Sequence, residues 1–279
     1  MTFEVQYRLI LDQTGFHRIW IPIPETNKNQ TISRLEIHTG LRMYLGRDTF
    51  YGNKFVIIED QVQAPDTVTI AFRCERRKAV PRSEDLDDAR KQFYLSSSHA
   101  EPKDDLWDLV CDSLDAEQEA FQYRLYNFLI SSMTPTEKSS SDIMEAYRSG
   151  QGTAREYAGL FAAISRTKGI PARYMAGVWI PERPEGRIKR ETAWNEFFLP
   201  QKGWVPVDLF KAEQDIRNAN DYFGSLDSRR ILFSIGRDII LPNGSRQDVV
   251  DHIVFPYVKV NGKVLARTNT VIVYREIEE

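Results

Sequence analysis

The sequence has few cysteines and no long apolar run, and both shortages narrow the range of functions. Its only cysteines, Cys74 and Cys111, are far apart and neither belongs to a CxxC pair. This argues against a disulfide scaffold and against a thiolate zinc site. Charged residues interrupt every hydrophobic run well before the roughly 20 apolar residues of a membrane span, and the N-terminus does not resemble a signal peptide. We therefore expect a soluble, cytoplasmic protein with no membrane partner.

An excess of positive charge is lacking too. The chain has 37 Lys and Arg residues against 40 Asp and Glu residues, a formal net charge of −3, so no global field attracts nucleic acid. We find no glycine-rich phosphate loop and no HExxH pattern. The four histidines are far from the other motifs and are interpreted as ordinary residues: His17, His38, His99 and His252. We predict no nucleic-acid partner, no metal and no cofactor.

The first part of the chain has the period of a half-buried β-strand. Apolar residues occupy every second position of residues 3–11. Further short strands are predicted where apolar segments are separated by Gly, Asn, Asp and Pro: residues 18–23, 31–38, 54–59 and 67–73. Since 279 residues are enough for two domains, we predict a β-sandwich-like domain at residues 1–80. A charged, serine-rich connector follows at residues 81–104.

The remaining residues, 105–279, change to a helical period. Apolar spacing predicts helices near residues 106–114 and 121–129, then a short helix from Ser141 that Gly150 stops. Thr153 followed by Glu156 is a capping box that begins another helix. Three strands are predicted after that helix, at residues 174–180, 192–199 and 203–209. Helices followed by antiparallel strands indicate an α+β domain, here with a C-terminal extension.

Three motifs carry a resemblance to a known family. Residues 152–158 with the Gly-Ile-Pro-Ala-Arg of residues 169–173 resemble the nucleophile helix of transglutaminase-like proteins, and Ala154 stands at the cysteine position. Residues 192–196 resemble the His-Ala-Trp strand of that family, with Thr192 at the histidine position. Residues 203–208 resemble the strand whose aspartate orients the histidine, and Asp208 is retained.

Weaker likeness covers most of the remaining chain. Residues 20–24 and 222–238 resemble segments common in bacterial members of the superfamily. Three motifs in the right order are more specific than any one of them. The resemblance implies a transglutaminase-like, papain-like domain with a central helix packed on an antiparallel sheet. It also implies acyl transfer or amide hydrolysis by a Cys-His-Asp triad.

The chemistry of that triad fails at two positions. A helix N-terminus lowers the pKa of a thiol and favours the thiolate, but Ala154 has no nucleophilic atom. Histidine accepts the proton in the triad, but Thr192 does not titrate near neutral pH. Engineered removal of the nucleophile would not require a change at Thr192 as well, so natural loss is favoured. Catalysis by the ordinary route is therefore excluded.

Several other residues have two readings. Thr153 offers a hydroxyl beside the lost thiol, but its capping role is the favoured reading. Asp208 either retains a site role or only accepts hydrogen bonds. The predicted strands also place three tryptophans at positions that lie near the cleft in the family, although core packing is the commoner fate of such residues: Trp179, Trp194 and Trp204.

Our leading hypothesis is an inactive homologue that keeps its cleft to bind a peptide or protein. The first alternative is a hydrolase of peptide or amide bonds with a non-standard arrangement, such as water activated with help from Asp208. The second is a structural or assembly protein whose cleft is filled by its own side chains. The sequence indicates no oligomeric state.

Overall fold

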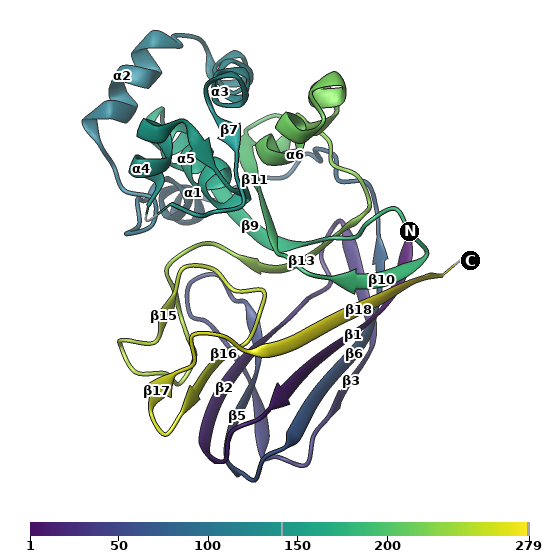
Figure 1. The fold of residues 1–279 in the computed structure, drawn as a ribbon. Helices are drawn as coiled ribbons and strands as arrows, with labels where there is room; N and C mark the ends of the chain where they lie inside the picture. The colour runs from purple at the N-terminus through teal and green to yellow at the C-terminus, as the bar shows by residue number, and fades with distance from the viewer. Residues whose placement is uncertain (141, 278–279) are drawn as a thin grey trace.

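The computed structural model describes residues 1–140 and 142–277. Figure 1 shows a helical part above a strand-rich part, with the two ends of the chain close together on one side. Ser141, the predicted cap of a short helix, lies outside the described residues. No helix in residues 1–140 and 142–277 is long and apolar enough to cross a membrane.

The strand-rich part is a sandwich of two five-stranded sheets. The first has the strand order β10-β18-β1-β6-β3 and the second β17-β16-β2-β5-β4. The first six strands of the chain are β1 (Thr2–Leu11), β2 (Gly15–Ile23), β3 (Gln30–His38), β4 (Met43–Arg47), β5 (Lys54–Val62) and β6 (Asp66–Arg76). The other four are β10 (Glu185–Ile188), β16 (Tyr257–Val260), β17 (Lys263–Val264) and β18 (Asn269–Ile277).

The structure confirms the five strands predicted in this part. Every second side chain of β1, from Phe3 to Leu11, is at most 3% exposed and packs in one core with residues of β2, β5 and β6. β4 was missed, because its five residues are all half-buried or exposed and carry no apolar pattern. The sandwich thus confirms an N-terminal β-sheet structure.

The C-terminal strands lie in this sandwich and not beside the helices. β18 pairs with β1 from Thr2↔Ile277 to Ile10↔Asn269, and β16 pairs with β2. This differs from the predicted grouping of residues 105–279, because pairing between the two ends of a chain leaves no local pattern. β10 also belongs to this sandwich, in the charged stretch 182–190 where no strand was predicted. The limits at residues 80 and 105 stay predictions.

The helical part confirms the α+β fold class. Its helices are α2 (Asp105–Ser113), α3 (Gln118–Ser132), α4 (Ile143–Ser149) and α5 (Ala154–Thr167). Its sheet has the order β12-β11-β9-β13 and consists of β9 (Ala172–Trp179), β11 (Thr192–Leu199), β12 (Gly203–Val207) and β13 (Arg230–Ile235). α5 is the central helix, because it packs on β9 and β11 on one side and on the other helices on the other side.

Short elements connect these layers. They are α1 (Asp88–Leu95), β7 (Thr134–Pro135), β8 (Gln151–Gly152), α6 (Leu209–Gln214), a 3₁₀ helix (Ile216–Tyr222), β14 (Ile239–Ile240) and β15 (Val249–Val250). Gly150 ends α4 with a φ of 64°, a left-handed conformation that glycine adopts without strain. The chain can therefore turn directly from α4 into β8 and the start of α5.

Candidate functional site

The N-terminus of α5 has the predicted capping box. The Thr153 backbone N–H donates to Glu156 Oε2 at 2.7 Å, and the Arg155 N–H donates to Thr153 Oγ1 at 3.3 Å. Ala154 is the first residue of the helix and is 7% exposed. The positive end of the helix dipole thus lies where the family places its thiolate, but the side chain there is a methyl group.

The three triad positions meet at one cleft. A concave region of about 1330 Å³ is lined by Ala154, by Thr192 at the start of β11 and by Asp208 directly after β12. β11 and β12 are adjacent and antiparallel, with Asn195 opposite Val207. The sheet therefore brings Thr192 and Asp208 to the same end as the start of α5.

The carboxylate of Asp208 forms an ion pair with a buried arginine, Arg230. Arg230 Nη1 forms an ion pair with Asp208 Oδ2, and both side chains are 1% exposed. Arg230 Nη2 also lies 2.8 Å from Asp227 Oδ2. The other Asp208 oxygen accepts the Lys211 N–H at 2.9 Å and caps α6. Burial raises the pKa of Asp208, and the charge of Arg230 opposes that shift.

Of the three tryptophans, one lines the cleft and two lie elsewhere. Trp179 is in the cleft wall, with Lys211 Nζ 4.3 Å from its ring centroid. Trp194 and Trp204 line a separate cavity of about 250 Å³. On β11, Asn195 Nδ2 donates to Ala158 O of α5, so the neighbouring Trp194 points to the opposite face of the sheet.

His252 is a cleft residue that the sequence interpretation missed. It follows β15, and its Nε2 lies 2.9 Å from Glu191 Oε1 while its Nδ1 lies 3.3 Å from Asp251 Oδ2. Burial alone lowers the pKa of His252, but the two carboxylates outweigh it and raise the value to about 9. At neutral pH the ring is therefore a cation held by acids. No sequence signal marks it, because His252 lies far along the chain from the motifs.

Both cysteines are remote from a nucleophile's environment. Cys74 is fully buried, and burial raises its pKa to about 12. Cys111 is 5% exposed on α2, and burial raises its pKa to about 11. Neither thiol forms thiolate readily at neutral pH.

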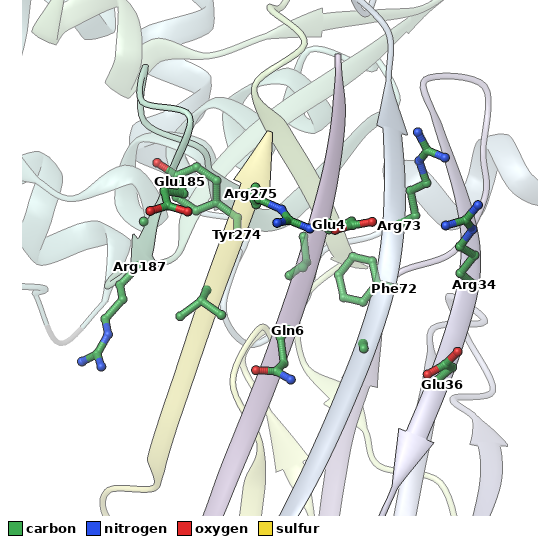
Figure 2. Close-up of a pocket in the computed structure, with 14 residues that line it drawn as sticks. Glu4, Gln6, Arg34, Glu36, Phe72, Arg73, Glu185, Arg187, Tyr274 and Arg275 are labelled. Carbon is green, nitrogen blue, oxygen red and sulfur yellow. Dashed lines mark hydrogen bonds and ion pairs between the residues drawn. The ribbon is translucent and has the colours of Figure 1, made fainter. Parts of the chain in front are cut away.

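A second hollow lies on the outer face of the first sheet (Figure 2). It has a volume of about 670 Å³ and crosses all five strands of that sheet. Its lining nearly balances in charge, with four arginines against three glutamates: Arg34, Arg73, Arg187 and Arg275 against Glu4, Glu36 and Glu185. Arg275 Nη2 lies 2.7 Å from Glu4 Oε2. Gly186 and Arg187 of β10 and Tyr274 of β18 line both this hollow and the triad cleft.

Comparison with known proteins agrees with this geometry. The sequence model of the transglutaminase-like superfamily matches residues 109–209. No curated protein matched the sequence. A candidate cysteine protease structure from Cytophaga hutchinsonii is similar over 100% of this chain and 91% of its own, with 13% identity and a TM-score of 0.69.

The periplasmic domain of TgpA from Pseudomonas aeruginosa has 15% identity and a TM-score of 0.43, over 78% of this chain and 90% of its own. The likeness to the Cytophaga structure shows a shared fold. The superfamily model covers α5, β11 and Asp208, so the similarity of this chain to the transglutaminase-like superfamily extends over residues 109–209.

Proposed function

We propose that this transglutaminase-like domain does not catalyse acyl transfer and that its cleft binds a segment of peptide or protein. The observation that carries the proposal is the methyl group of Ala154 at the N-terminus of α5, in an open cleft of about 1330 Å³. A nucleophile is absent from the place where the helix dipole would activate one, while the room for a ligand remains.

The acid and base partners support the same reading. Thr192 cannot take a proton from a nucleophile, and His252 is already protonated at neutral pH by its contacts with Glu191 and Asp251. The carboxylate of Asp208 is engaged by Arg230. His252 and Asp208 are therefore each held by a partner of opposite charge.

The cleft supports binding because it combines depth with an amphipathic wall. Its lining includes Trp179, Phe210 and Phe255 beside polar and charged residues. Apolar surface with a few polar groups is typical of ligand sites. A cleft of this volume also disfavours the structural alternative, which requires that its own side chains fill it.

Hydrolysis with help from Asp208 remains the second candidate function. The raised pKa of this buried carboxyl group, in a cleft, is the observation that favours it. The ion pair with Arg230 opposes it, since an acid that is paired in this way is poorly placed to activate water.

Both candidates are tested with fluorescein-labelled decapeptides of acidic, basic and uncharged composition. Wild type and Thr192→Trp, which adds a large side chain to the cleft lining, are compared by fluorescence anisotropy and by release of labelled fragments. We expect at least one peptide to bind wild type, to bind Thr192→Trp at least about tenfold more weakly, and to stay intact. Cleavage that is lost in Asp208→Asn would support the hydrolase instead, and equal binding to both proteins would exclude the cleft.

A further inference from the structure

The cleft differs in charge from the chain as a whole. Its lining has eight Lys and Arg residues against three acids, Glu137, Glu191 and Asp208, although the protein has a formal net charge of −3. A concave site that gathers one sign of charge focuses the field on a ligand of the opposite sign. The eight cations are Lys138, Arg155, Arg183, Arg187, Lys189, Arg190, Lys211 and Arg230.

Three of these cations are neutralised within the protein. Arg230 pairs with Asp208 and Asp227, Arg155 with Glu156 and Asp251, and Arg190 with Glu137. The other five form no ion pair with any carboxylate of the described residues: Lys138, Arg183, Arg187, Lys189 and Lys211. All but Lys211 are exposed. The cleft therefore presents unpaired positive charge from the β7–α4 loop, from the segment around β10 and from α6.

The acids of the cleft do not cancel this charge. Glu137 forms an ion pair with Arg190, Asp208 with Arg230, and Glu191 with the protonated His252. Glu182 and Glu185 lie in the β10 segment but outside the cleft lining. A bound ligand thus meets cations that no carboxylate of the cleft lining neutralises.

Arg183, Arg187 and Lys189 lie on or beside β10, which is an edge strand of its sheet. Among the described strands, β10 is the outermost of its sheet and pairs with β18 alone. Figure 2 shows its residues Glu185 and Arg187 beside Tyr274 and Arg275 of β18. Gly186, Arg187 and Ile188 line the cleft, so this edge borders it.

The ladder fixes which backbone groups are free. Glu276 N–H donates to Pro184 O, and bonded residues alternate along an antiparallel pair. Glu185 and Arg187 therefore direct their backbone N–H and C=O groups away from β18. Within residues 1–140 and 142–277, no hydrogen bond reaches these groups from the other side. An extended polypeptide can pair with such an edge, whereas a nucleic acid has no matching backbone.

We propose that the cleft binds an acidic segment of polypeptide, extended along the free edge of β10 with its carboxylates beside Arg183, Lys189 and Lys138. This proposal rests on the proposed function, in which the cleft binds a peptide, and adds the charge of that peptide and its position along β10. Backbone hydrogen bonds to Arg187 supply register, and the cations supply selectivity for acidic side chains.

The charge is tested by fluorescence anisotropy with three labelled decapeptides, (Glu-Ser)5, (Gln-Ser)5 and (Lys-Ser)5, and with a labelled ten-nucleotide oligo-dT. We expect (Glu-Ser)5 to bind at least about tenfold more tightly than (Gln-Ser)5, and less tightly as salt is added. The variant Lys138→Glu/Arg183→Glu/Lys189→Glu should bind it at least about tenfold more weakly. A matched control, Arg246→Glu/Lys263→Glu/Arg267→Glu, makes three equal reversals at exposed residues outside the cleft and should change binding less than about twofold.

The strand edge is tested by Arg187→Pro against Arg187→Ala. Both variants remove the guanidinium, but only proline removes the N–H that faces the cleft, and an edge strand tolerates that loss. We expect Arg187→Pro to bind (Glu-Ser)5 at least about fivefold more weakly than Arg187→Ala. Circular dichroism and urea unfolding show whether each variant is folded.

The outcomes separate this inference from the proposed function. Cleft-dependent binding of (Gln-Ser)5 with the affinity of (Glu-Ser)5 would overturn the acidic selectivity and leave the binding cleft intact. Binding of oligo-dT as tight as that of (Glu-Ser)5 would mean that the cations serve a nucleic acid. No binding of any peptide would overturn both, and equal affinity of Arg187→Pro and Arg187→Ala would remove the edge pairing.

Discussion

The helix side and the strand side of the candidate site depart from a Cys-His-Asp triad in different ways. On the helix side the scaffold is complete, with the Thr153–Glu156 capping box in place, and only the side chain of Ala154 lacks the reactive atom. On the strand side, the carboxylates have cationic partners that a Cys-His-Asp triad lacks. Asp208 forms an ion pair with Arg230, and Glu191 contacts His252. The nucleophile can be lost by one local change, but a retained acid in a buried site needs a new countercharge.

The largest expected effect concerns that countercharge. Arg230→Leu leaves the Asp208 carboxylate buried without a cation, and we expect a loss of about 3–5 kcal/mol in the free energy of unfolding. Asp227→Asn is the milder control, because the Asp227 side chain is 35% exposed. The double variant Asp208→Asn/Arg230→Leu should recover part of the loss. Urea unfolding measures all three, and a cost below about 1 kcal/mol for Arg230→Leu would show that the pair is not the countercharge.

The second expected effect is on pH dependence at His252. Its pKa is raised in the folded state from about 6.5 to about 9, so folding favours the protonated ring. This stabilisation is fully present below about pH 6.5 and is lost as the pH rises through about 9. The difference in unfolding free energy between wild type and His252→Gln should therefore shrink between these pH values. A difference that stays constant with pH would show that the ring is not held as a cation by Glu191 and Asp251.

The smallest effect tests the helix side alone. Thr153→Ala removes the cap of α5 and one hydrogen bond to Glu156, and we expect a loss of about 1 kcal/mol in the free energy of unfolding. Thr153→Ser keeps the hydroxyl and should be close to wild type. Thermal and urea unfolding give the comparison, and equal stability of Thr153→Ala and wild type would mean that the cap contributes little.

Local sequence signals predicted the helix side best. The capping box of α5 and the alternation of β1 are short-range patterns, and the structure has both. Ala154, Thr192 and Asp208, the residues that the motifs single out, all line one cleft. The ordinary role expected for His252 missed its place in the cleft, because only the fold brings residue 252 next to Glu191.

Long-range partners escaped the sequence for the same reason. No local sequence pattern near residue 230 predicts the ion pair of Arg230 with Asp208, and none near residue 269 predicts that β18 pairs with β1. The tryptophans show a further limit. Strand alternation separates Trp194 from the helix face of β11, but the motif gives no indication of which face borders the cleft.

The central claim, a site that keeps its scaffold and lacks only reactive atoms on the helix side, is tested most directly by restoring a thiol at α5. Iodoacetamide labelling is followed against pH for Ala154→Cys and for Ala154→Cys/Thr192→His, with wild type as the control whose two buried thiols react slowly. We predict that the introduced thiol in the double variant ionises well below about 8.5, because the helix dipole and the imidazolium both stabilise the thiolate. We predict no peptide turnover, because Asp208 is held in an ion pair with Arg230 and so is not available to orient the introduced histidine. An unshifted thiol pKa in a folded double variant would contradict the account.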